Sequence, residues 1–139
     1  MAATSLLRLA TLIDRGDLRE VAEKTLRLFA RHMGESPTGS GQMLLALDFL
    51  LGPVKEIAVV GPTAGEPVRQ VLRAVHGRFR PNIVVAVGDP SGDKTAVELI
   101  PLLRDRPALA DVTIYICENF ACKAPIVGAD NSIRAVESL

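Results

Sequence analysis

Two cysteines, Cys117 and Cys122, are the residues whose type and spacing are best suited to chemistry. They follow an apolar segment directly, and their thiols could reach disulfide distance if the chain curls back on itself. The pair is not the C-x-x-C of a thioredoxin site, and two cysteines alone cannot complete a four-ligand zinc site. Three interpretations stay open at this point: a structural turn, a redox-active thiol pair and part of a metal site.

Two further loops carry groups that could bind ligands. Gly61 and Gly65 bound a loop between an expected strand and an expected helix, where backbone N–H groups could meet a phosphate. The loop matches neither the dinucleotide nor the Walker fingerprint. The next loop carries Asp89, Asp93 and Lys94, and its two aspartates could act as acid or base or hold a cation. The same residue types build ordinary exposed turns, so a plain turn is the alternative at both loops. We predict no bound metal and no cofactor.

The elements that hold these loops follow from the apolar pattern. Three apolar runs at 56–60, 83–87 and 112–116 predict buried strands. Helical spacing predicts helices at 67–78 and 94–104, the second interrupted at Pro101, and a last short helix capped by Asp130. The predicted class is α/β, with a three-stranded, mostly parallel sheet in β-α-β-α-β order. In such a sheet the three loops after the strands would gather at one edge.

The N-terminal part is predicted to be helical at 4–14, 18–33 and 42–51, with Asp17 and Glu20 forming a capping box. The predicted domains are therefore a helical segment at 1–53 and a small α/β domain at 54–139. Helix 4–14 has more apolar surface than one neighbour can cover. Two explanations are a chain that is part of a longer protein, and self-association through this helix.

Composition excludes several classes of protein. Sixteen basic residues balance sixteen acidic ones among 139, which argues against binding to nucleic acid or to a membrane surface through bulk charge. No apolar run approaches the ~20 residues that span a bilayer. With two cysteines the chain is no disulfide-built scaffold, and a cytoplasmic location is the default expectation.

The segment from Tyr115 to Pro125 resembles a known signature. It reads Y-I-C-E-N-F-A-C-K-A-P and is similar to the Y-V-C-x-N-F-x-C-x-x-P motif near the C-terminus of large thioredoxin-domain-containing proteins. This family includes the spermatogenesis-associated thioredoxin-like protein and bacterial relatives. Segments 5–10, 41–53 and 79–82 resemble other parts of the family in the same order. The matching motif positions are Tyr115, Cys117, Asn119, Phe120, Cys122 and Pro125.

The resemblance implies a place in a larger protein. Family members carry a thioredoxin-like domain, then a helical toroid, then an α/β tail, so the chain would hold the last toroid helices and the tail. Its partners would be the missing domains of the parent chain. We expect a structural or interaction module without catalysis of its own. One alternative is a thiol-redox element in which Cys117 and Cys122 exchange electrons with the thioredoxin-like domain, and another is the rim of a carbohydrate-processing toroid. The resemblance carries over no catalytic residues, and enzymatic activity is left open.

Overall fold

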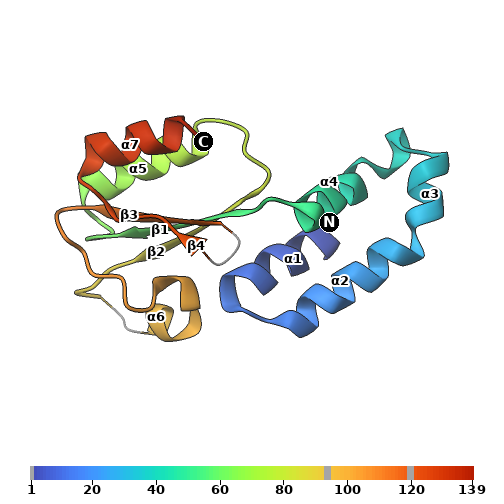
Figure 1. The fold of residues 1–139 in the computed structure, drawn as a ribbon, viewed down its shortest axis with the longest axis horizontal. Helices are drawn as coiled ribbons and strands as arrows, with labels where there is room; N and C mark the ends of the chain where they lie inside the picture. The colour runs from blue at the N-terminus through green and yellow to red at the C-terminus, as the bar shows by residue number, and fades with distance from the viewer. Residues whose placement is uncertain (1, 93–94, 119–120) are drawn as a thin grey trace.

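The computed structural model describes residues 2–92, 95–118 and 121–139 of the chain, and its elements are labelled in Figure 1. The helices are α1 (Ala2–Ile13), α2 (Gly16–Leu28), α3 (Ala30–Glu35), α4 (Gly41–Leu51), α5 (Glu66–His76), α6 (Thr95–Leu99) and α7 (Ala129–Glu137), with 3-10 turns η1 (Thr38–Ser40) and η2 (Pro101–Leu103). The strands are β1 (Lys55–Val60), β2 (Ile83–Gly88), β3 (Thr113–Glu118), β4 (Ala121–Cys122) and β5 (Ile126–Val127). β1, β2, β3 and the break at Pro101 lie where the apolar pattern predicted them, whereas the two-residue strands β4 and β5 were not predicted.

The sheet is mixed rather than mostly parallel. Its order is β2-β1-β3-β4, and β5 pairs with β3. The predicted α/β class and the parallel pairing of β1 with β2 are confirmed, but β3 runs antiparallel to β1 and the sheet has five strands, so the prediction of a three-stranded, mostly parallel sheet was wrong in number and direction. The connection from β2 brings Thr113, the first residue of β3, opposite Val60 at the end of β1, where Gly88 at the end of β2 also lies. The chain therefore re-enters the sheet at the same end of the strands at which it left β2.

This reversal separates the loops that were expected to meet. Gly61 follows β1 and Asp89 follows β2, and their loops share one edge of the sheet, where the Thr63 N–H donates to Asp89 Oδ2 at 3.0 Å. β3 ends at Glu118, which lies opposite Lys55 at the start of β1. The cysteine segment therefore lies at the other edge, next to the N-terminal helices.

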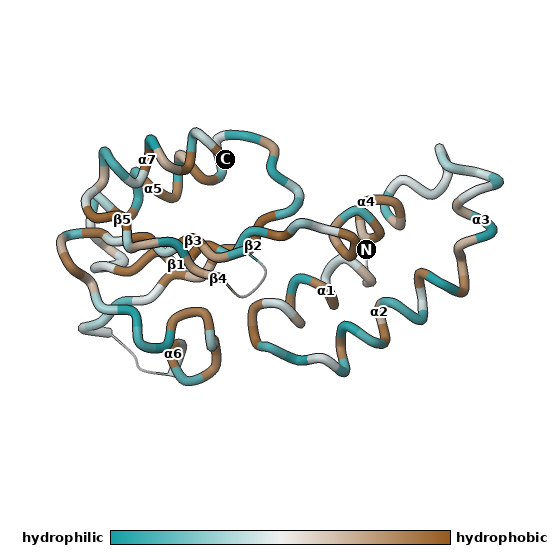
Figure 2. Tube along the Cα trace, in the orientation of Figure 1, coloured by the Kyte–Doolittle hydropathy of each residue, from teal (hydrophilic) through white to brown (hydrophobic). Residues whose placement is uncertain are grey.

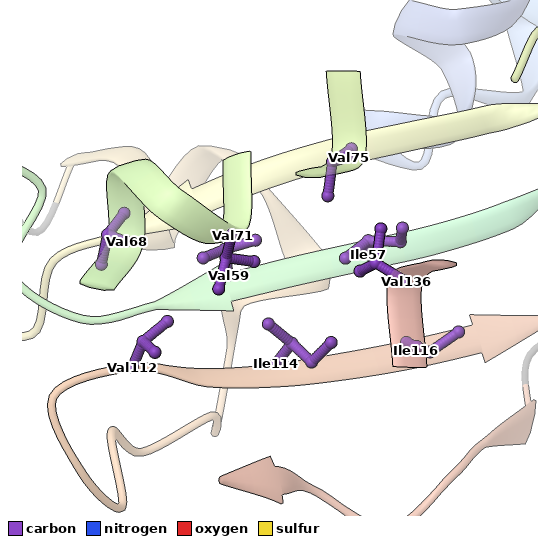
Figure 3. Close-up of a cluster of buried hydrophobic side chains, with 9 residues drawn as sticks. All are labelled: Ile57, Val59, Val68, Val71, Val75, Val112, Ile114, Ile116 and Val136. Carbon is purple, nitrogen blue, oxygen red and sulfur yellow. The ribbon is translucent and has the colours of Figure 1, made fainter. Parts of the chain in front are cut away.

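Helices cover both faces of the sheet. α5 and α7 lie side by side on one face, and α6 lies on the other (Figure 1). Figure 3 shows the first core, in which valines of α5 and Val136 of α7 meet the side chains of β1 and β3. Its buried members are Ile57, Val59, Val68, Val71, Val75, Val112, Ile114, Ile116 and Val136. Residues 57–60 of β1 and 113–117 of β3 are all buried, and the sheet is largely hydrophobic (Figure 2), because both of its faces are covered.

The helices α1 to α4 form a layer beside the sheet with a core of its own around Leu7, Leu26 and Phe49. The predicted helix 18–33 is divided at Phe29, where the chain bends so that Met33 is buried while Phe29 is 42% exposed. The predicted capping box is wrong, since α2 begins at Gly16 and Asp17 pairs with Arg15 instead. Asp130 likewise lies in the first turn of α7, after the N-cap residue Gly128. No helix among the described residues is long and apolar enough to cross a membrane.

Arg8 joins the helical layer to the sheet. Its guanidinium donates to the carbonyl of Ile83 at 3.0 Å and to that of Pro81 at 2.5 Å, and it lies 5.2 Å from the centre of the Phe49 ring. A hydrogen bond from a charged donor is worth about 1.5–3 kcal/mol, and these bonds are partly buried. One side chain of α1 thus holds β2 and α4 together.

We predict that Arg8→Ala lowers the free energy of unfolding by about 2–3 kcal/mol, because it leaves two carbonyls without their donor. Urea denaturation followed by circular dichroism measures this change. Arg31→Ala is the control: Arg31 forms an exposed ion pair with Glu35, and its loss should change stability by no more than about 0.5 kcal/mol. Equal effects of the two variants would contradict the role of Arg8.

Candidate functional site

The two cysteines lie opposite each other on neighbouring strands. Cys117 of β3 is the register partner of Cys122 of β4, and a disulfide joins them with their Cα atoms 4.0 Å apart. Cys117 is only 3% exposed, whereas Cys122 lies at the surface. The chain does curl back after β3, and it does so as an antiparallel pair that brings the sulfurs together. The site therefore joins one buried cysteine to one exposed cysteine.

Glu56 continues the row formed by the two cysteines. Glu56 of β1 is the register partner of Cys117 on the other side of β3. Residues directly opposite in an antiparallel pair point to the same face, with Cβ atoms about 5 Å apart. Glu56, Cys117 and Cys122 thus stand side by side on the face of the sheet that carries η2.

Arg106 lies over this row. Its Nη2 donates to Cys117 Sγ at 3.2 Å and to Cys122 Sγ at 3.1 Å. Its Nε donates to the carbonyl of Leu102 in η2 at 2.7 Å. The preceding residue, Asp105, has a φ of 54°, a left-handed conformation that aspartate tolerates better than most residues, and it turns the chain between η2 and Arg106. The turn and the Leu102 carbonyl together fix the guanidinium against both sulfurs.

The ring of Tyr115 packs against the guanidinium of Arg106. The guanidinium lies 4.9 Å from the centre of the Tyr115 ring, a distance at which the cation and the ring attract each other. The Tyr115 hydroxyl donates to the carbonyl of Pro107 at 2.8 Å, which ties the ring to the segment that carries Arg106. Tyr115 was predicted as a motif residue, and its position gives it a structural role beside the cysteines.

A cavity of about 870 Å³ opens onto these residues. Its walls come from α1, α2 and α4 on one side, and from β1, η2 and the cysteines on the other. The charged side chains that line it are Asp14, Arg15, Arg19, Glu56 and Arg106. Burial raises the pKa of the Glu56 carboxyl; the positive charge of Arg106 opposes this effect and the negative charge of Asp14 adds to it.

The arrangement is suited to thiol–disulfide chemistry. A guanidinium beside a sulfur stabilises the thiolate, which is the reactive form in exchange. An incoming thiolate can reach Cys122, and Cys117 would then leave as a thiolate beneath Arg106. Within the described residues no group of three or more His, Cys, Asp or Glu side chains gathers at metal-binding distance.

One remaining motif residue, Pro125, belongs to the part of the chain that the structure describes. Pro125 is exposed just before β5. Asn119 and Phe120, which were predicted as motif residues, lie outside the described residues, as do Asp93 and Lys94. Their proposed roles therefore stay predictions.

The Gly61 loop is shaped by contacts within the chain. The Gly61 N–H donates to the Gly88 carbonyl at 3.0 Å, and the Gly65 N–H donates to the Pro62 carbonyl at 2.8 Å. A Cβ at Gly61 would lie 2.5 Å from the Asp111 carbonyl oxygen, so close packing requires glycine there. Both N–H groups are used by the fold, and phosphate binding at this loop stays a prediction.

Asp89 organises the neighbouring turn. Its carboxylate accepts from the Ser91 hydroxyl at 2.6 Å, from the Ser91 N–H at 2.9 Å and from the Thr63 N–H at 3.0 Å. The Ser91 hydroxyl and then these N–H groups lower the pKa of Asp89 to about 2. A second cavity, of about 600 Å³, is lined by Asp89, Val60, Leu103 and Arg106 among others. Asp89 thus joins the loops after β1 and β2, and its predicted acid–base role stays untested.

Sequence reasoning missed Glu56 and Arg106. Glu56 follows Lys55 at the start of β1 and faces the same side as Ala58 and Val60, a signal that the alternation of the strand contains. Arg106 lies in an irregular segment whose spacing gives no indication of the contact. Only the folded chain brings it to the sulfurs.

The sequence is similar to part of a larger protein. The chain is 30% identical over 129 residues to Spermatogenesis-associated protein 20 of Homo sapiens and 30% identical to that of Rattus norvegicus. Each match covers 91% of this chain but 16% of the relative, so the chain spans about a sixth of the length of the curated relatives it matches. No family model matches the sequence, and no solved structure matches it. The predicted relationship to a spermatogenesis-associated protein is confirmed, whereas the thioredoxin-like domain and the toroid stay predictions.

We predict a pH-dependent contribution of Asp89 to stability. Its pKa of about 2 in the folded chain lies below the ordinary 3.8, so its stabilising effect is fully present above pH 4 and is lost as the pH falls toward 2. Wild type should therefore be more stable than Asp89→Asn at pH 6, and the difference should shrink between pH 4 and pH 2. Urea midpoints measured across this range test it. Ser91→Ala, which removes one donor, should show a smaller difference, and a pH-independent gap would contradict the prediction.

Proposed function

We propose that the chain is one region of a larger polypeptide and that Cys117 and Cys122 form a thiol–disulfide exchange element within it. The observation that carries the proposal is the contact of Arg106 Nη2 with both sulfur atoms. A purely structural disulfide needs no cation, since its sulfurs are uncharged. A pair that cycles through thiolates benefits from one in every turnover.

The size of the closed loop supports the same conclusion. The disulfide links residues five apart in sequence, and closing so short a loop restricts the unfolded chain by only roughly 2 kcal/mol. β3 and β4 are also paired without it, and the Lys123 N–H donates to the Ile116 carbonyl at 3.0 Å. In a reducing compartment, disulfides are usually transient and catalytic. A role in exchange therefore accounts for the pair better than a role in stability.

The proposed step uses a dithiol partner. A thiolate of the partner attacks Cys122 Sγ, a mixed disulfide forms, and the Cys117–Cys122 bond breaks with Cys117 leaving as a thiolate that then gains a proton. The second thiolate of the partner then attacks the first sulfur of the partner, which is bonded to Cys122 in the mixed disulfide, and Cys122 is released as a thiol. Two electrons pass from the partner to the chain, so the partner ends as a disulfide and the chain as a dithiol.

We further propose that this partner is a thioredoxin-like domain of the same polypeptide. The support is the resemblance of the Tyr115–Pro125 segment to the thioredoxin-domain-containing family and the greater length of the relatives. Exposure of Cys122 at the mouth of a cavity fits approach by a folded partner domain.

Trapping experiments test the direction of attack. We expect Cys117→Ser, which keeps the exposed cysteine, to accumulate a stable mixed disulfide with a single-cysteine thioredoxin whose thiol has first been converted to its thionitrobenzoate disulfide, because the Cys122 thiolate displaces thionitrobenzoate as the leaving group. Cys122→Ser should form far less of this adduct, because Cys117 is buried. Non-reducing electrophoresis and mass spectrometry measure both. Equal trapping by the two variants would exclude Cys122 as the entry point.

The same proposal predicts the effect of Arg106. A hydrogen bond from a charged donor is worth about 1.5 kcal/mol or more, so Arg106→Met should slow reduction of the disulfide by dithiothreitol at least ~10-fold. Arg106→Lys, which keeps the positive charge, should recover part of the rate. If the wild-type disulfide is reduced only on global unfolding, the exchange proposal fails.

A structural or interaction module is the second candidate function. The observation that favours it is the attachment of the helical layer to the sheet by Arg8. In that case the α/β part serves as a platform for the helices, and the disulfide fixes the end of β3. Reversible reduction without unfolding distinguishes the two candidates. A role as the rim of a carbohydrate-processing toroid stays a prediction.

Self-association through the first helix also remains a proposal. α1 packs on α2, α4 and β2, and Leu9, which is 44% exposed, remains at its surface. If the helix mediates association, light scattering should show dimers at high concentration and Leu9→Lys should abolish them. A clean monomer for wild type would contradict the proposal.

A further inference from the structure

We propose that Glu56 is the proton-transfer residue for Cys117, delivering a proton when this sulfur leaves and accepting one when it attacks. This inference rests on the proposed exchange function and extends it to a residue outside the cysteine motif. Cys117 is 3% exposed, so its contact with solvent is small and a neighbouring group that carries the proton would speed proton transfer at its sulfur.

The register of the sheet places Glu56 for this task. Glu56 and Cys117 are directly opposite on antiparallel β1 and β3, with side chains on the same face. Both residues line the cavity of about 870 Å³, so the carboxyl can exchange protons with solvent while it faces the sulfur. Glu56 therefore connects a buried sulfur to water.

The surroundings leave the carboxyl available. Among the described residues, none forms a hydrogen bond or an ion pair with the Glu56 carboxyl group. The charged groups that face it across the cavity are Arg106, Asp14, Arg15 and Arg19, and the neighbouring strand residues Lys55 and Glu118 alternate to the other face. Arg15 is bound to Asp17, and Arg106 to the two sulfurs.

The electrostatics suit both directions of transfer. Burial raises the pKa of Glu56, with Arg106 opposing and Asp14 adding to this effect, so its protonated form persists to higher pH than that of an exposed glutamate. During reduction, the carboxylic acid gives its proton to the Cys117 thiolate and is reprotonated from the cavity. During oxidation, the carboxylate takes the Cys117 proton as the thiolate attacks the Cys122 sulfur of a mixed disulfide.

A two-phase release experiment isolates this step. The reduced chain is treated with the aromatic disulfide 5,5′-dithiobis(2-nitrobenzoate) between pH 5 and pH 8. A first thionitrobenzoate is released when Cys122 forms the mixed disulfide, and a second is released when Cys117 attacks it. The first phase reports on the exposed sulfur and serves as an internal control.

We expect Glu56→Gln to slow the second phase about 10- to 100-fold near pH 6–7 and to leave the first phase unchanged. Glu56→Asp, which keeps a carboxylate, should recover part of the rate. Glu118→Gln is the matched control, since it removes a carboxyl next to Cys117 on the opposite face. The direction of the rate change distinguishes two roles of Glu56. If Glu56 acted only as a negative charge, its removal would stabilise the Cys117 thiolate and speed the second phase.

Asp14→Asn keeps the test valid should Glu56→Gln fold poorly. Asp14 is exposed, and asparagine tolerates its left-handed conformation with φ of 51°. Loss of the Asp14 charge should shift the pH profile of the second phase to lower pH. A wild-type chain that never releases the second thionitrobenzoate would overturn the exchange function itself. A normal wild type with an equally fast or faster Glu56→Gln, or an unshifted Asp14→Asn profile, would overturn only the role of Glu56.

Discussion

The antiparallel pairing of β3 with β1 determines where every feature of the site lies. It places Cys117 beside Glu56, and it sends the end of β3 toward the start of β1 rather than toward the loops that follow β1 and β2. The segment after β3 then pairs on the free side of β3 and brings Cys122 opposite Cys117. Had β3 run parallel to β1, the cysteines would have followed the strand at the edge occupied by Asp89.

Arg106 places a positive charge next to the two sulfur atoms. The guanidinium contacts both sulfurs and rests on the Tyr115 ring, while its Nε is held by the Leu102 carbonyl. The contacts come from β3, β4 and η2, so the position of the cation depends on these elements and on the turn at Asp105 together. The cavity that exposes this group is closed on its other side by the N-terminal helices. The site therefore belongs to neither the helical part nor the sheet alone.

Much of this fold could be predicted from the sequence, and the limits have physical causes. The apolar runs located β1, β2 and β3 within two residues, because strands covered on both faces must be apolar throughout. The same property hid the direction of β3, since an internal antiparallel strand covered on both faces has the same pattern. The cysteine pair was recognisable from its spacing and from the motif. Glu56 and Arg106 were not, because their contacts depend on strand register and on an irregular turn.

Arg8 has a consequence for the solubility of the chain. β2 is an edge strand, and the Lys55 N–H bonds to the Asn82 carbonyl at 3.0 Å, so the next carbonyl along the strand, that of Ile83, points away from β1. An open edge of this kind is a template on which a strand of another molecule can add. The Arg8 guanidinium donates a hydrogen bond to the Ile83 carbonyl, and α1 packs against this end of the strand. The Arg8 side chain, which joins the two layers, thereby also hinders the addition of a strand from another molecule at this edge of the sheet.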